Sequence, residues 1–373
     1  MKRPQNWYIA IKGYKNYTRW NLTPAVVPSL VPPLVPALVP ALVPASNPVT
    51  NDEDELLLLQ DTDYSINKNN ITITASTKFG GAISSVKVNG VNGIEFINSY
   101  DHGRELQSAL NASIKPNATL IPEIYNPTEA GSSSDATKST STSQIKEIST
   151  NNNTLTNKTQ MAYWLRPGKK SFGNLALNKS PLSNNYLSKN VSFNSNINNV
   201  VDYTVTFTVP SNQNGESYYF LQFEVLTGYM PIEFSNFWTF QNNNLVTLSN
   251  QENGEQSYPI LFSNGNNDND MAMGVVVAKR TTYVTTNSQY GNYGRFTFSP
   301  DQTPNKMPIL KWNYVFRIWP AKILANNGII TSGTAPLNET QKDYTFPLYL
   351  VIGTKSECLI ALQTLASNDL IYN

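Results

Sequence analysis

The sequence predicts an all-β protein built as a large antiparallel β-sandwich. Apolar and polar residues alternate over about ten positions from Val200 to Val209, as expected of a half-buried strand. Shorter apolar or alternating runs follow one another along the chain, separated by turn residues. Helical spacing of apolar residues occurs in 356–366 alone. Many strands, frequent turns and a single helix are typical of a sandwich.

The strands are expected in the following order. Residues 71–75 alternate in polarity, and 80–97 form a hairpin whose turns are marked by Asn89-Gly90 and Asn92-Gly93. We expect residues 218–226 to pair with 200–209 as the antiparallel neighbour. Residues 132–159 are rich in Ser, Thr and Asn, which favours a mobile loop. The remaining predicted strands are 161–165, 273–278, 294–298 and 312–319.

The first 61 residues differ from the rest of the chain. Residues 1–23 are polar and aromatic, and 24–50 carry a proline at every fourth position from Pro24 to Pro48. Proline at this density excludes an α-helix or a paired strand and favours polyproline II. We expect either a plain stalk or an arm that packs on another subunit and builds a homo-oligomer. The sandwich domain is expected at 62–373.

Composition excludes several classes of protein. Charged residues make up 14% of the chain and the net charge is +1, so a basic face for nucleic acid is not expected. No apolar run reaches the length of a membrane span, and the first residues are too polar for a signal peptide. A single cysteine, Cys358, excludes an intrachain disulfide and lies in an apolar run typical of a buried thiol. Most of the 41 aromatic residues (20 Tyr, 15 Phe and 6 Trp) are expected in the core.

The segment 98–131 is the best candidate for a site. It contains the chain's one histidine, His102, and places Asp101 and Arg104 on either side of a glycine. The guanidinium of arginine can hold a carboxylate or neighbouring hydroxyls in two hydrogen bonds, and histidine can exchange a proton near neutral pH. We expect Asp101, Arg104, Gln107 and Asn126 to bind a substrate, with His102 and Glu129 as candidate catalytic groups. The structural alternatives are an internal Asp101–Arg104 ion pair and a turn capped by Glu129.

A second group of candidates lies in 229–238. Glu233 is followed by a Phe/Trp cluster, and a carboxylate among aromatic side chains can have a raised pKa and act as a general acid. Tyr229 is a candidate base, and Trp238 could stack on a pyranose ring. The alternative for Glu233 is a residue on the rim of the site. Residues 266–270 could bind calcium, but they lack the EF-hand spacing and a polar turn is the simpler prediction. No other metal or cofactor is expected.

Several motifs resemble a family of poorly characterised, mostly secreted microbial β-sandwich proteins. They are Phe79-Gly-Gly-Ala-Ile-Ser-Ser85, Asp101-His-Gly-Arg-Glu-Leu-Gln107, Asn126-Pro-Thr-Glu-Ala-Gly131, and matching runs at 159–165, 202–210 and 226–234. The resemblance covers about 75–350. The pattern of a glycine-led strand, a turn and then Asn98, Asp101, Gly103-Arg104 and Gln107 is also similar to carbohydrate-active proteins of the galactose-mutarotase-like type. It implies a mutarotase-like supersandwich or jelly roll, although fold does not settle function.

The resemblance implies a carbohydrate-binding or carbohydrate-processing protein, located outside the cell or on a surface. Three reactions stay open: a glycoside hydrolase using Glu129 and Glu233, a polysaccharide lyase using His102 or Tyr229 with Arg104, and a mutarotase using His102. The alternative from another class is a structural subunit of a virion, filament or surface layer that assembles through 24–48. The chain lacks the P-loop, dinucleotide, zinc-protease and serine-hydrolase motifs.

Overall fold

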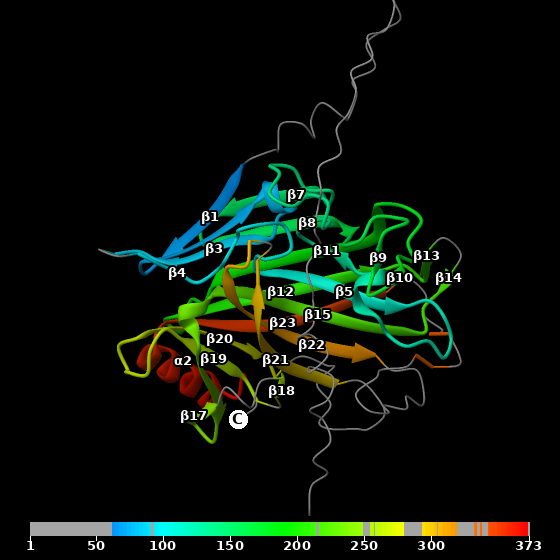
Figure 1. The fold of residues 1–373 in the computed structure, drawn as a ribbon. Coiled ribbons are helices and arrows are strands. Elements are labelled where there is room, and N and C mark those ends of the chain that lie inside the picture. The colour runs from blue at the N-terminus through cyan, green and yellow to red at the C-terminus, as the bar shows by residue number, and fades with distance from the viewer. Residues whose placement is uncertain are drawn as a thin grey trace, which may run out of the picture.

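The computed structural model describes residues 62–90, 93–213, 216–248, 254–256, 258–279, 293–303, 305–318, 332–333, 336–337 and 342–371. The predicted segments 1–23 and 24–50 lie outside these residues. The described part is built almost entirely of antiparallel strands, so the predicted all-β sandwich class is confirmed (Figure 1). Two sheets account for most of these strands, and one helix lies against the larger sheet.

The smaller sheet contains β1 (Asp63–Lys68), β2 (Ile71–Ser76), β3 (Ile83–Val88) and β4 (Ile94–Glu95) in that order. Its pairings confirm the predicted strand at 71–75 and the hairpin within 80–97. Inward residues Ile66, Ile73 and Val86 are almost fully buried and join the main core. The β2–β3 connection includes η2 (Thr77–Phe79) and then turns at Gly80 and Gly81, which reach across to the larger sheet.

The larger sheet has the order β17-β16-β19-β20-β23-β12-β11-β8-β6-β5-β15-β22-β21-β18, with β7 paired to β8. The bounds of these strands, in chain order, are β5 (Gln107–Ser113), β6 (Pro127–Thr128), β7 (Gln144–Asn151), β8 (Thr154–Tyr163), β11 (Leu182–Phe193), β12 (Val200–Val209), β15 (Phe220–Pro231), β16 (Asn236–Gln241), β17 (Asn244–Leu248), β18 (Gly254–Gln256), β19 (Ile260–Ser263), β20 (Met271–Val277), β21 (Tyr293–Gln302), β22 (Pro308–Ile318) and β23 (Lys342–Thr354). Short pieces outside the sheet are β9 (Lys170–Ser171), β10 (Asn174–Leu175), β13 (Asn212–Gln213), β14 (Glu216–Ser217), η3 (Pro122–Tyr125) and η4 (Ile232–Phe234).

The larger sheet curls back on itself, so its two halves pack face to face. Strands far apart in the sheet order meet through their aromatic rings. Phe207 of β12 lies 4.9 Å from Phe223 of β15, and Phe237 of β16 lies 4.6 Å from Phe298 of β21, measured between ring centroids. Rings at these separations bury large apolar areas and hold the two halves together. The core therefore lies between the halves of one continuous sheet.

Two details of the expected strand order are wrong. Residues 218–226 do contain a strand, β15, but it pairs with β5 and β22, whereas β12 pairs with β11 and β23. β12 and β15, which were expected to pair within the sheet, instead face each other across the sandwich. The segment 132–159, where a loop was expected, includes the β7–β8 hairpin. β7 buries little of its surface, so its residues are as polar as those of a loop. The strand predicted at 161–165 is the end of β8.

The predicted helix is α2 (Lys355–Ser367), and it begins with a capping box. The Thr354 side chain accepts from the Glu357 backbone, and the Glu357 side chain accepts from the backbone of Thr354. Cys358 and Leu365 are fully buried on its inner face against β20 and β23, as expected for an inert thiol. Burial raises the pKa of the Cys358 thiol. Among the described residues, no helix combines the length and apolar character needed to cross a membrane.

Candidate functional site

The loop before β5 brings the first predicted residues together. Arg104 donates to Asp101 over 2.8 Å, and their side chains are 18% and 5% exposed. Gly103 lies between them with φ +88°, and the Trp164 ring packs so closely that a Cβ atom would lie 2.5 Å from its Cζ3. Only glycine tolerates both conditions, so Gly103 fixes the loop that presents the ion pair.

The ring of Tyr229 connects this loop to the sheet. The guanidinium carbon of Arg104 lies 6.0 Å from the ring centroid, and Nζ of Lys311 lies 5.5 Å from it. Tyr229 on β15 and Lys311 on β22 are direct cross-strand partners. The same face of β15 carries Glu224, whose Oε2 lies 3.7 Å from Nζ of Lys311. We call Asp101, Arg104, Glu224, Tyr229 and Lys311 the Tyr229 cluster.

Electrostatics keep Glu224 and Lys311 charged. Burial alone would raise the pKa of Glu224, but the charge of Lys311 and hydrogen bonds from Asn111 and Thr227 outweigh it and lower the pKa. Burial alone would lower the pKa of Lys311, but the negative charge of Glu224 outweighs burial and raises it. The two groups therefore act as a stable, oppositely charged pair on the sheet face.

Tyr229 is held as a neutral phenol. Burial raises its pKa, and the carboxylates of Glu224 and Asp301 raise it further against the opposing charge of Lys311. A phenol with a raised pKa gives up its proton less readily than free tyrosine. The arrangement therefore does not favour Tyr229 as the base of a lyase.

Two polar atoms of the Tyr229 cluster are buried without a hydrogen-bond partner in the described chain. Oδ1 of Asp101 and Nε of Arg104 have no hydrogen-bond partner among the residues that the structure describes. Burial raises the pKa of Asp101, with the charge of Arg104 acting in the opposite direction. The side chains of this cluster that reach water are Arg104 and Lys311, which are 18% and 29% exposed, and cationic donors of this kind can bind hydroxyl groups.

His102 and Gln107 hold the adjacent loop from inside. The His102 ring contacts the carbonyl oxygens of Ala130 and Lys138 through Nδ1 (2.8 Å) and Nε2 (3.0 Å), and it packs edge-on against Phe79. Oε1 of Gln107 accepts from the backbone N–H of Ala130. Because both ring nitrogens are occupied and the residue is 1% exposed, the geometry favours a structural role for His102 over proton transfer.

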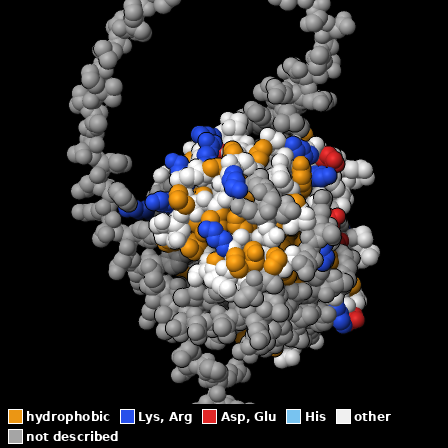
Figure 2. Space-filling model, turned by 90° about the vertical axis from the view of Figure 1, so that its right-hand side faces the viewer, with side chains coloured by type: hydrophobic (Ala, Val, Ile, Leu, Met, Phe, Trp, Pro, Cys, Tyr) orange, Lys and Arg blue, Asp and Glu red, His pale blue; other side chains and the backbone are white. Residues whose placement is uncertain are grey.

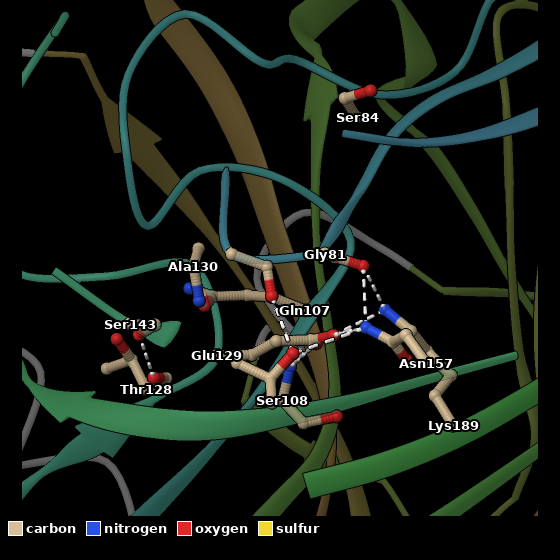
Figure 3. Close-up of polar contacts among 12 residues, drawn as sticks. Gly81, Ser84, Gln107, Ser108, Thr128, Glu129, Ala130, Ser143, Asn157 and Lys189 are labelled. Atoms are coloured by element: carbon tan, nitrogen blue, oxygen red, sulfur yellow. Dashed lines mark hydrogen bonds and ion pairs between the residues drawn. The ribbon is translucent and has the colours of Figure 1, made fainter. Parts of the chain in front are cut away.

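Glu129 lies in a separate, fully buried cluster (Figure 3). Its Oε1 accepts from Nζ of Lys189, and both side chains are 0% exposed. Asn157 donates to the same Oε1 over 3.5 Å and to the carbonyl oxygen of Gly81 over 3.2 Å. We call Gly81, Glu129, Asn157 and Lys189 the Lys189 cluster. Glu129 thus has an internal partner and does not face a surface on which a sugar could bind.

The remaining predicted residues lie apart from the Tyr229 cluster. Glu233 is exposed on η4, and Asn126 uses its backbone carbonyl to accept from Trp164. Trp238 on β16 donates to Ser263 and packs against the ammonium of Lys355, 4.4 Å from the ring centroid, at the start of α2. The structure thus brings Asp101, Arg104 and Tyr229 together and leaves Glu233 and Trp238 elsewhere.

The candidate calcium loop is occupied by protein contacts. Asp268 lies 3.4 Å from Nζ of Lys355, and Asp270 accepts from the backbone of Asn267. Within the described ranges, no group of three or more His, Cys, Asp or Glu side chains has the arrangement needed to hold a metal ion. The loop behaves as the predicted polar turn.

Sequence reasoning missed two residues of each cluster. Glu224 and Lys311 were passed over within apolar strands, and Lys189 and Asn157 within polar ones. The signal was the alternation itself. Polar residues recur at alternate positions, as at Gln222 and Glu224 of β15 and at Lys311 and Asn313 of β22, and such a recurrence marks the face that turns away from the core. Position in the strand alone does not reveal which neighbouring strand supplies the partner.

The β9–β10 hairpin presents a different surface. Phe172 and Leu175 are 56% and 52% exposed, and Arg166, Lys169 and Lys170 are exposed beside them. Figure 2 views the molecule from the side on which this hairpin lies and shows basic side chains interspersed with hydrophobic ones, with few acidic groups. This surface offers positions such as Arg166, where a charge can be removed without altering the Tyr229 cluster.

No family model matches the sequence, and the search of curated proteins found no match. Solved structures do show similarity. An α-mannosidase from Enterococcus faecalis V583 is 12% identical over 83% of this chain and 31% of its own, with a TM-score of 0.44. A 4-α-glucanotransferase from Thermococcus litoralis is 8% identical over 78% of this chain and 37% of its own, with a TM-score of 0.35.

A GalM/aldose epimerase homologue from C. elegans is 8% identical over 79% of this chain and 99% of its own, with a TM-score of 0.36. The described chain spans about a third of the length of the first two proteins. TM-scores below 0.5 at such identities transfer no activity to it.

Proposed function

We propose that this protein binds carbohydrate, and that the Tyr229 cluster is where it does so. The observation that carries the proposal is the pair of partly exposed cationic side chains, Arg104 and Lys311, which lie over the ring of Tyr229 beside the carboxylate of Asp101. A sugar offers neighbouring hydroxyls that both donate and accept. A carboxylate beside two cationic donors can satisfy them in a fixed orientation.

The charge balance of the site favours a neutral sugar. Asp101, Glu224 and nearby Asp301 supply three negative charges against the two positive charges of Arg104 and Lys311. A uronate would add a further negative charge to this balance, whereas hydroxyl groups would not. We therefore expect neutral polysaccharides to bind more tightly than uronate-containing ones.

Binding without bond cleavage is the form that the geometry supports best. The candidate catalytic groups are engaged elsewhere: His102 with two carbonyl oxygens, Glu129 with Lys189, and Tyr229 as a neutral phenol. The enzymatic alternatives are tested by incubation with a polysaccharide panel. New reducing ends alone would mean hydrolysis, and reducing ends together with unsaturated-uronate absorbance would mean a lyase.

The test of the site is affinity electrophoresis in gels that contain neutral or uronate polysaccharides. Arg104→Ala is expected to lose retardation in neutral-polysaccharide gels, while its circular dichroism stays that of the wild type. The matched control is Arg166→Ala, which removes the same charge from the exposed β9–β10 surface and should bind normally. Equal retardation of Arg104→Ala and the wild type would refute the site.

A structural role is the second candidate, and the prolines at every fourth position from Pro24 to Pro48 favour it. Valine, leucine and alanine between these prolines would be protected from water by packing on another subunit. A chain lacking 24–48 should then lose an assembly that light scattering detects for the full chain. A full-length chain that stays monomeric at high concentration would exclude this role. Both roles suit a protein outside the cell or on a surface.

A further inference from the structure

The Lys189 cluster places an amine, a carboxylate and an amide together in the interior. Lys189 on β11 and Asn157 on β8 are direct cross-strand partners. Figure 3 shows their side chains side by side, both directed at the same two oxygen atoms. Nζ of Lys189 lies 2.7 Å from the carbonyl oxygen of Gly81 and also contacts Oε1 of Glu129. Nδ2 of Asn157 contacts the same two oxygens.

Each group of this cluster is held in place by the fold. Oε2 of Glu129 accepts from the backbone N–H of Ser108 over 3.2 Å, which leaves Oε1 for the amine and the amide. Gly81 has φ +88°, and a Cβ there would lie 2.3 Å from Nδ2 of Asn157, so glycine is what lets the backbone approach the amide. Oδ1 of Asn157 is buried and has no hydrogen-bond partner within the described chain.

Burial also raises the free energy of the ion pair relative to that of the neutral amine and acid. Moving an ammonium and a carboxylate out of water costs several kcal/mol per ion, which their attraction only partly offsets. Burial lowers the pKa of Lys189, with the charge of Glu129 opposing the shift. A neutral lysine amine is a nucleophile, and an amide carbon beside it is its electrophilic partner.

From this geometry we propose that Lys189 and Asn157 become joined by an intramolecular isopeptide bond, with Glu129 moving the protons. The ammonium of Lys189 first gives a proton to Glu129, which leaves two neutral groups. Nζ then bonds to Cγ of Asn157, Glu129 carries a proton from Nζ to Nδ2, and the Cγ–Nδ2 bond breaks. One ammonia molecule leaves, and Glu129 ends as a neutral acid. No atom is oxidised or reduced.

This reaction replaces two buried charges with a neutral amide and a neutral acid. It also ties β8 to β11 covalently, as a disulfide would, in a chain that has one cysteine and can form no intrachain disulfide. It is independent of sugar binding, because the Lys189 cluster is fully buried and shares no residue with the Tyr229 cluster.

The test is the intact mass of the purified full chain under denaturing conditions. We expect a mass lower than the sequence mass by one ammonia, and a branched tryptic peptide that joins the segments around Asn157 and Lys189. Lys189→Ala, Asn157→Ala and Glu129→Gln should each show the full mass of their sequence. Lys158→Ala, on the neighbouring position of β8, should keep the loss.

Two results would overturn the proposal. The first is a wild-type mass equal to that of the sequence, which is decisive even if the variants do not fold. The second is a loss of ammonia that persists in Lys189→Ala. Asn-Gly pairs such as Asn89-Gly90 and Asn264-Gly265 can lose ammonia by closing a succinimide ring. Hydroxylamine cleaves that ring but gives no branched peptide, so the two sources of the same mass change are distinguished.

Discussion

The Lys189 cluster and the Tyr229 cluster contain similar groups but differ in access to water. Lys189 and Glu129 are 0% exposed, whereas Lys311 and Glu224 are 29% and 13% exposed and Arg104 is 18% exposed. In the Lys189 cluster, the two charges are paired with each other and closed off from water. On the sheet face, the charges are also paired, but the side chains of Arg104 and Lys311 reach water. Burial therefore restricts the Lys189 cluster to reactions within the chain, whereas the Tyr229 cluster has side chains that can meet a ligand.

Breaking the buried pair should have the largest effect on stability. Lys189→Met can form no isopeptide bond and leaves the Glu129 carboxylate buried without its partner, so it should lose at least the roughly 3–5 kcal/mol that breaking a buried pair costs. The partly exposed counterpart, Lys311→Met, should cost less because Glu224 keeps its hydrogen bonds from Asn111 and Thr227. Urea unfolding followed by fluorescence measures both. Equal losses in the two variants would contradict the contrast between the clusters.

His102→Phe should have the next largest effect. The substitution keeps an apolar ring against Phe79 but removes the ring nitrogens that contact the carbonyl oxygens of Ala130 and Lys138, at about 0.5–1.5 kcal/mol for each hydrogen bond that is lost. Sugar binding should persist because His102 lies outside the Tyr229 cluster. Lost binding with unchanged urea unfolding would instead indicate a direct role in the site.

The third prediction concerns pH. Glu105 is fully buried, and burial raises its pKa well above the ordinary value of 4.5. Between the unfolded and folded pKa the folded state holds the extra proton, so stability falls as pH rises, by roughly 1.4 kcal/mol per pH unit for one proton. Glu105→Gln should remove this loss.

Urea unfolding of the wild type and Glu105→Gln at several pH values above 4.5 would measure the difference. Parallel pH profiles would show that Glu105 stays ionised in the folded protein.

The smallest effect on stability is expected at Arg104. Arg104→Lys keeps the charge beside Asp101, so unfolding should change by less than about 1 kcal/mol. The planar fork of the guanidinium is lost, and sugar affinity should fall about tenfold. Titration calorimetry with the best oligosaccharide of the panel compares both proteins. Undiminished affinity would mean that charge alone, and not the guanidinium, serves the site.

The strands were largely predictable from the sequence, but their partners were not. Alternation located β12 at Val200–Val209, and the helical spacing of apolar residues in 356–366 located α2 to within one residue at each end. Pairing depends on how the sheet curls, and Phe207 meets Phe223 across the sandwich although the strand pairing of β12 lies elsewhere. Local patterns carry no record of such long-range contacts.

The same limit of local sequence patterns explains which residues of the two clusters were predicted. Asp101 and Arg104 are three residues apart, so their pairing was readable from the sequence as an alternative. Glu129 and Lys189 are 60 positions apart, and nothing in their local sequences links them. The sequence around Glu129 indicated a carboxylate in a loop, and the fold shows that its partner is Lys189 of β11.

The wide spacing of the Lys189 cluster has a consequence for biosynthesis. Gly81 and Lys189, which meet at 2.7 Å, are separated by 108 positions. The ribosome must therefore release about two fifths of the sandwich domain, up to Lys189, before the cluster can close. Until then Asn157 of β8 can contact both Gly81 and Glu129, but the amine that completes the cluster is missing.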